Sequence, residues 1–176
     1  MIATVGPIQI AGARVTTPSE REIALTRGFD APARLVFRTL TEPELVKRWL
    51  YGPEGWSFAV CEIDLRVGGA YRYQWRGPDG SAMGLGGVYV EIARPSRIIN
   101  TQRFDDPFDS GESRVTTVLA EQDGGTTLTM TVRYDSREAR DGAIASNMAK
   151  GAAASFERLA ALLASEVPRG EADEGA

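Results

Sequence analysis

Six tryptophan and tyrosine residues are the side chains of this sequence best suited to bind a small molecule. They are Trp49, Trp56, Tyr71, Tyr73, Trp75 and Tyr89. Tyr71, Tyr73 and Trp75 alternate with polar residues, so a β-strand would place all three rings on one face. Each ring offers a large apolar surface with one polar group, which suits a ligand with few polar groups. Packing in an ordinary hydrophobic core is the alternative, and the sequence leaves both interpretations open.

Acidic residues offer two further candidate sites. Glu62 and Asp64 would share one face of a strand, and a carboxylate facing an apolar cavity could act as a general acid or base. We favour the alternative that they are exposed or form ion pairs, with Arg66 or Arg103 as partners. The acidic run from Asp105 to Glu112 does not have the spacing of a twelve-residue calcium loop, so we interpret it as a solvated loop. No residue is assigned a catalytic role.

The sequence contains no histidine and a single cysteine, Cys61. Histidine is the commonest general base at neutral pH and a common metal ligand. Its absence excludes Ser-His-Asp and Cys-His catalytic arrangements and the usual zinc sites. One cysteine cannot form an intrachain disulfide. We therefore expect a protein without metal or cofactor, in the cytoplasm.

Length and charge narrow the class of partner. The chain has 176 residues, of which 43% are hydrophobic, enough for one domain with a substantial core. Its formal net charge of −4 provides no basic surface for nucleic acid. No apolar run approaches the roughly 20 residues of a membrane span. The expected partner is a hydrophobic small molecule, and the sequence leaves open whether the protein is a homodimer.

The apolar pattern predicts one α+β domain over residues 21–164. A strand is followed by two short helices, then by about six strands that end at turn signals rich in glycine, proline and aspartate. Connections of hairpin length imply an antiparallel sheet. Residues 1–20 are interpreted as an irregular N-terminal segment and residues 165–176 as an acidic, disordered tail.

A long amphipathic helix is predicted over residues 136–164. Its apolar residues recur three or four positions apart and form one stripe, which consists of Ala145, Met148, Ala152, Phe156, Leu159 and Leu163. Residues 151–154 are all small, so the helix either approaches the sheet closely or leaves space beside it. We add Met130, Met148 and Ala152 to the six aromatic residues as candidate ligand-binding residues.

Seven short motifs occur in a fixed order along the chain: Asp30–Pro32, Trp49, Asp64–Tyr73, Pro78–Gly80, Gly87–Ile92, Pro95–Ile98 and Asn147–Gly151. Together they resemble the family named for the activator of the heat-shock protein 90 ATPase. That family lies within the START and pollen-allergen-like (SRPBCC) superfamily of helix-grip domains. The resemblance covers residues 21–164. It implies a curved, seven-stranded antiparallel sheet wrapped around the C-terminal helix, with an apolar cavity between them. Many relatives have tryptophan where this chain has Ala152, which implies a larger cavity or a bulky neighbour.

Three functional hypotheses follow. The leading one is a cofactor-free helix-grip protein that binds an apolar or aromatic small molecule between sheet and helix. The second is an aromatase/cyclase-like enzyme on the same scaffold, with Glu62, Arg103 and the tyrosines as available ionisable groups. The third is a protein-binding module related to co-chaperones. Eukaryotic co-chaperones of the family carry an additional N-terminal domain, and we expect no chaperone activation from this chain.

Overall fold

The computed structural model describes residues 6–173, with side chains through residue 166. The strands are β1 Ile8–Ile10, β2 Ala13–Thr16, β3 Glu22–Phe29, β4 Ser57–Ile63, β5 Ala70–Arg76, β6 Ala82–Ala93, β7 Arg97–Phe104, β8 Ser113–Gln122 and β9 Gly125–Arg133. The helices are α1 Ala33–Thr41, α2 Pro43–Val46, α3 Arg137–Ala145 and α4 Met148–Asp173. The strands form one antiparallel sheet in the order β1-β2-β3-β9-β8-β7-β6-β5-β4. This is the predicted α+β helix-grip architecture.

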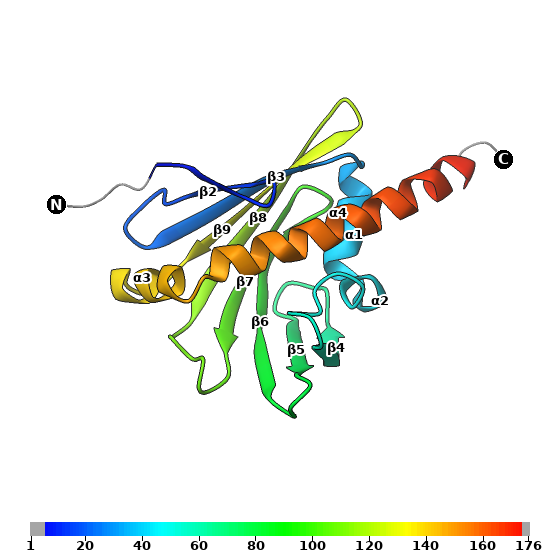
Figure 1. Cartoon of the computed structure of the whole chain (residues 1–176). Coiled ribbons are helices and arrows are strands. Elements are labelled where there is room, and N and C mark those ends of the chain that lie inside the picture. The colour runs from blue at the N-terminus through cyan, green and yellow to red at the C-terminus, as the bar shows by residue number, and fades with distance from the viewer. Residues whose placement is uncertain (1–5, 174–176) are drawn as a thin grey trace.

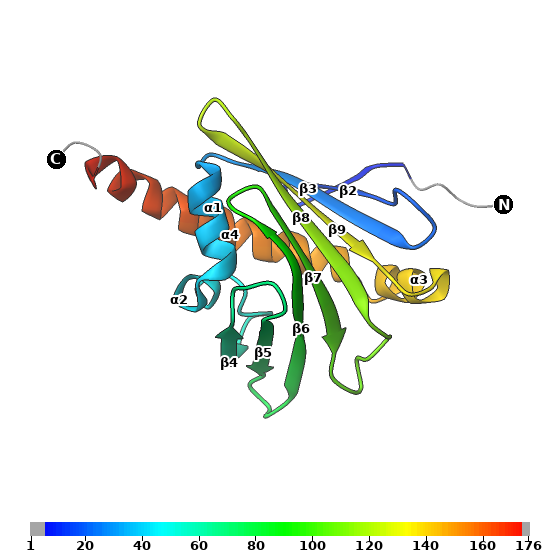
Figure 2. The same cartoon turned by 180° about the vertical axis from the view of Figure 1, so that it is seen from behind.

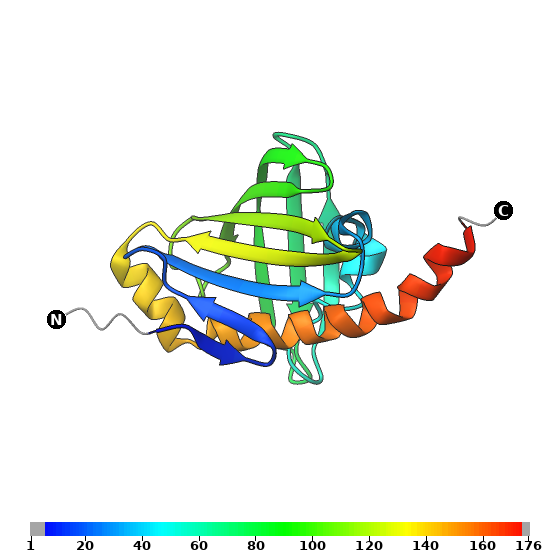
Figure 3. The same ribbon diagram turned by 90° about the horizontal axis from the view of Figure 1, so that it is seen from above.

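One face of the sheet, called here the inner face, is crossed by α4 (Figures 1 and 2). The sheet curves strongly, so that β1–β3 and β4–β6 run in very different directions in the view from above (Figure 3). Alternation along each strand decides which side chains lie on the inner face. On β5, the rings of Tyr71, Tyr73 and Trp75 are buried, whereas Arg72 and Arg76 lie on the outer face.

The sheet has nine strands rather than the predicted seven. The two additional strands, β1 and β2, form a hairpin within the segment that was predicted to be irregular. Its turn residues, Ala11 and Gly12, both have positive φ, as in the tight hairpin turns that match strand twist. Strands of three and four residues are too short to show a clear alternating pattern in the sequence. In the structure they are held by backbone pairing of β2 with β3. Residues 1–5 of that segment lie outside the described residues.

The predicted single C-terminal helix is two helices. The helix α3 starts at Ser136, whose hydroxyl accepts a hydrogen bond from the Ala139 N–H at 3.0 Å, and it ends before Asn147. Asn147 has a φ of 59°, a left-handed conformation that asparagine tolerates and that interrupts a helix. The helix α4 then continues to Asp173, so most of the predicted disordered tail is helical. Residues 174–176 lie outside the described part of the chain.

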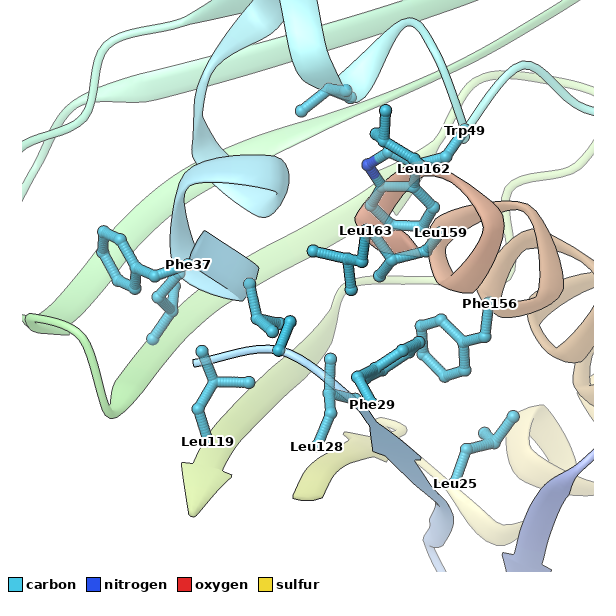
Figure 4. Packing of buried hydrophobic residues seen from close by; sticks show 14 of the residues in the cluster. Leu25, Phe29, Phe37, Trp49, Leu119, Leu128, Phe156, Leu159, Leu162 and Leu163 are labelled. Atoms are coloured by element: carbon cyan, nitrogen blue, oxygen red, sulfur yellow. The ribbon is translucent and has the colours of Figure 1, made fainter. Parts of the chain in front are cut away.

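The core is densest where the second half of α4 meets the sheet. Phe156, Leu159 and Leu163 are buried and point toward Phe29 and Leu128 on the sheet (Figure 4). The backbone of α4 comes near β1, β2, β3 and α1. Of the stripe predicted for the helix, Ala145 is wrong, because it lies in α3 and is exposed. The remaining members are half-buried at the start of α4 and buried further along it.

Candidate functional site

The aromatic residues of β5 and β6 form a continuous wall on the inner face. The ring centroids of Tyr71 and Tyr73 are 5.2 Å apart, and those of Tyr71 and Tyr89 are 5.5 Å apart. Trp75 follows at 6.0 Å from Tyr73, and Phe58 of β4 lies 5.2 Å from Trp75. These separations are typical of packed aromatic pairs. Four of the six predicted aromatic residues are therefore brought together, with Phe58 as a member that the sequence analysis missed.

Two tryptophans connect this wall to the short helices. The Trp75 indole N–H donates to the Leu50 carbonyl at 2.7 Å, and the Trp49 indole N–H donates to the Thr39 carbonyl at 2.8 Å. The Trp49 ring lies 6.5 Å from the ring of Phe156 on α4. Because both indole N–H groups are bonded within the protein, these tryptophans contribute only apolar surface to the inner face. Trp49 belongs to the closed part of the core.

The remaining predicted residues divide between two places. Trp56 lies before β4, where its ring is near Gly77 in the turn after β5, so it is separate from the wall. Met130 is on β9, and Met148 and Ala152 are in the first turns of α4. These three side chains are half-buried and pack against the core. In the structure, eight of the nine candidates lie on or near the helix-covered face, and Trp56 lies apart from it.

A small hydrogen-bond network adds polar groups to the wall. The Tyr71 hydroxyl donates to the Thr101 carbonyl at 2.6 Å and accepts from the Asn100 amide at 3.0 Å. The same amide nitrogen lies 3.2 Å from the Thr101 carbonyl oxygen. To reach β7, the Tyr71 side chain crosses the intervening strand β6 at Gly87, where a Cβ atom would collide with that carbonyl. The glycine at position 87 therefore permits this approach. A separate β-bulge follows in the same strand, between Tyr89 and Glu91.

Burial raises the pKa of the wall tyrosines. For Tyr89 it reaches about 12, with loss of solvation as the largest cause. The pKa of Tyr71 and that of Tyr73 are also raised, again mainly by burial. These hydroxyl groups remain protonated and uncharged throughout the physiological pH range. They can donate or accept hydrogen bonds, but they are poor bases.

Three inner-face positions in the middle of the sheet remain partly exposed although α4 crosses this face. They are Asn100 on β7, Thr117 on β8 and Met130 on β9. Thr117 pairs directly with Met130, and its inner-face neighbours along β8, Val115 and Leu119, are both buried. Asn100 and Thr117 were missed by the sequence analysis. The alternation along β8 indicates which side of the strand Thr117 occupies, but not that a helix would leave it accessible.

The predicted acidic groups lie outside this region. Glu62 is exposed and lies directly opposite Arg72 of β5 in the sheet. Asp64 accepts a hydrogen bond from Arg66 at 2.8 Å. The guanidinium of Arg103 donates to the Asp109 carboxylate at 2.8 Å. Both acidic residues are therefore exposed, as favoured, and Asp64 pairs with Arg66, but the prediction of Arg103 as a partner is wrong because Arg103 pairs with Asp109.

Two surface clefts are lined mainly by charged side chains, and one of them is bordered by Tyr134, which lies on the inner-face alternation. One, of about 420 Å³, is lined by Arg72, Arg103, Asp105 and their neighbours; the other is near Arg114, Arg133 and Tyr134. Within residues 6–173, no three His, Cys, Asp or Glu residues lie close enough to bind a metal ion. Over the same range, no helix combines the length and apolarity that crossing a membrane requires.

Comparison with known proteins identifies relatives over nearly the whole domain. The family described as "Activator of Hsp90 ATPase homolog 1-like protein" matches residues 30–164. A crystal structure of a Rhodobacter sphaeroides protein is 33% identical, with a TM-score of 0.83, and the match covers 88% of this chain and 99% of that chain. A Chromobacterium violaceum protein is also 33% identical, with a TM-score of 0.72 over 82% of this chain and 98% of that chain. No curated protein shows significant similarity.

Proposed function

Because this chain belongs to the Activator of Hsp90 ATPase homolog 1-like family, on a helix-grip fold, we propose that it binds an apolar or aromatic small molecule between the sheet and the first turns of α4. The observation that carries the proposal is the partial exposure of Asn100, Thr117 and Met130. Side chains at the centre of a helix-covered sheet are normally fully packed. Here, three adjacent strands each contribute one accessible side chain on the inner face.

The opposing part of α4 supports the same location. Met148, Ala152 and Ala154 are half-buried, and Ala153 between the two alanines is fully buried. None of these side chains is both large and rigid. Methionine adapts its shape to irregular neighbours, so Met130 and Met148 suit a surface that must accommodate a ligand.

The wall defines the chemistry of the proposed ligand. The inner face carries the packed rings of Tyr71, Tyr73 and Tyr89. An aromatic ligand could add a further ring to this series through offset or edge-to-face contacts. Burial of such a ligand against apolar side chains would stabilise the complex by about 25 cal/mol for each Å² of apolar surface removed from water. The proposed ligand is therefore a compact apolar or aromatic molecule.

Methionine methyl signals provide a test with an internal control. We would label the methionine methyl groups with ¹³C and titrate the protein with 2-methylnaphthalene at pH 7. The signals of Met130 and Met148 should shift with a common dissociation constant. Met83 of β6 lies opposite Trp75 of β5, at the far end of the aromatic wall, so its methyl signal should shift little. Unchanged Met130 and Met148 signals at saturating probe would overturn the proposal.

The hypothesis of an aromatase/cyclase-like enzyme is less well supported than ligand binding, because its candidate charged residues do not face α4. Its candidate groups Glu62 and Arg103 lie exposed on the outer side of the sheet, as their positions opposite Arg72 and Gly86 indicate. The tyrosines that do face α4 have raised pKa values, which disfavours their use as bases. No observation specifically favours the co-chaperone alternative, and we restrict the proposal to ligand binding.

A further inference from the structure

One side of the inner face is polar. Asn100 and Gln102 of β7, Thr117 of β8 and Tyr134 after β9 share the inner-face alternation with buried neighbours such as Val115 and Val132. All four of these polar side chains are partly exposed. The proposed ligand site is therefore bordered by the aromatic wall on β5 and β6 and by uncharged polar side chains on β7 to β9.

These polar side chains retain unused hydrogen-bonding capacity. The Asn100 amide nitrogen is engaged with Tyr71 and Thr101, but its carbonyl oxygen has no partner among the described residues. The same holds for the hydroxyl of Thr117 and the hydroxyl of Tyr134. No fully buried side-chain oxygen or nitrogen atom in the described residues lacks a partner. The unpaired groups are therefore those that a ligand or water could still reach.

The middle of the inner face, around Asn100, Thr117 and Met130, carries no charged side chain on β5 to β9. From β5 to β9, the described inner-face positions hold uncharged residues except for Glu121 near the end of β8, whose carboxylate accepts a hydrogen bond from the Ala33 N–H of α1 at 3.0 Å. On the neighbouring strand β3, Arg27 forms an ion pair with Glu157 of α4, so its charge is already compensated. A charged ligand would lose hydration without gaining a counterion, which is strongly unfavourable.

Building on the proposed function, we infer that the ligand is electrically neutral and carries a hydrogen-bonding group, such as a hydroxyl or carbonyl, at one end. That group contacts Asn100 and Thr117, while the apolar body lies against Tyr71, Tyr89 and Met130. A hydroxyl could donate to the free Asn100 carbonyl oxygen and accept from the Thr117 hydroxyl. A purely apolar ligand would instead leave both protein groups without partners and without water.

Three probes of nearly equal shape test this inference: 2-naphthol, 2-methylnaphthalene and 2-naphthoate. We would measure their dissociation constants at pH 7 by titration of the wild-type protein. We expect 2-naphthol to bind about 3- to 10-fold more tightly than 2-methylnaphthalene, because its hydroxyl gains a hydrogen bond. The anionic 2-naphthoate should bind at least about tenfold more weakly than 2-naphthol.

A pair of adjacent threonines provides a matched control. Thr117→Val removes a hydroxyl on the inner face without changing the side-chain shape, and Thr116→Val does the same on the outer face. Thr117→Val should reduce the preference for 2-naphthol over 2-methylnaphthalene by about 3-fold, and Thr116→Val should leave it unchanged. Asn100→Leu should bring the ratio close to one; Thr117→Val keeps the test valid if that variant does not fold.

The outcomes separate the two proposals. If none of the three probes binds, the proposed function itself fails. If 2-methylnaphthalene binds as tightly as 2-naphthol, and Thr117→Val does not change the ratio, the ligand-binding function stands and the inference of a polar end is wrong. Tightest binding of 2-naphthoate would likewise overturn the inference of a neutral ligand.

Discussion

The two halves of α4 face the same sheet but pack against it very differently. Its second half inserts Phe156, Leu159 and Leu163 among large side chains, and all three are almost completely removed from solvent (Figure 4). Its first turns carry Met148 and Ala152, which are both half-buried, although Ala153 beside them is fully buried. One helix thus has a closed region that fixes its position and an open region beside it.

This difference assigns separate roles to stability and binding. The closed region excludes water, so it supplies the apolar burial that holds α4 on the sheet. The open region contains partly exposed polar and flexible side chains, which contribute less to folding and can accept a ligand. A binding surface can be maintained in this way because the closed region, further along the same helix, prevents it from collapsing.

The largest expected effect is in the closed region. Leu159 is fully buried, so Leu159→Ala should lower the free energy of unfolding by about 2–5 kcal/mol through lost burial and the cavity that remains. Met148→Ala, at the half-buried start of the helix, should cost about 1 kcal/mol or less. Denaturant unfolding measures both. Equal losses would mean that the two regions are packed equally well.

Filling the open region should remove ligand binding. At about 100 times its dissociation constant, 2-methylnaphthalene should stabilise the wild-type protein by about 2.7 kcal/mol. Ala152→Trp should abolish that gain while the protein stays folded, and Ala161→Trp, on the exposed side of the same helix, should retain it. Unfolding with and without the probe checks this. A full ligand response in Ala152→Trp would place binding elsewhere.

The dependence of stability on alkaline pH tests whether water is excluded from the tyrosine hydroxyl groups of the aromatic wall. Burial raises the pKa of Tyr89 to about 12, whereas a tyrosine in an unfolded chain titrates near ~10. Between these values the unfolded state loses the proton and the folded state keeps it, so stability falls as pH rises. Each such tyrosine contributes a slope of about 1.4 kcal/mol per pH unit. Tyr89→Phe should reduce the measured slope by that amount, and an unchanged slope would show that water reaches this hydroxyl.

The smallest expected effect concerns the outer surface of the open region. Gly151 lies in α4 with empty space where a Cβ would extend, so Gly151→Ala should stabilise the protein by about 0.5–1 kcal/mol. Thermal or denaturant unfolding of the two proteins measures the change. Destabilisation that grows with protein concentration would instead reveal that this side of the helix is covered by a second copy.

The sequence alone was sufficient to predict most of the architecture. Alternating residues such as Tyr71, Tyr73 and Trp75 indicated strands with one buried face, and this was confirmed. The short β1–β2 hairpin and the break at Asn147 were missed. Each depends on a few residues whose local preference is weak until neighbouring strands or helices fix their conformation.

What the sequence determined by itself is the type of residue available: aromatic rings, no histidine, one cysteine, and small residues near Ala152. Only the tertiary structure decided which of these residues meet. Tyr71 contacts Asn100, and Thr117 lies opposite Met130, because sheet register joins strands that are distant in the chain. Periodicity assigns a residue to a face, but its exposure depends on how closely another element packs there. For that reason the open region beneath the start of α4 could be recognised only once the helix was in place.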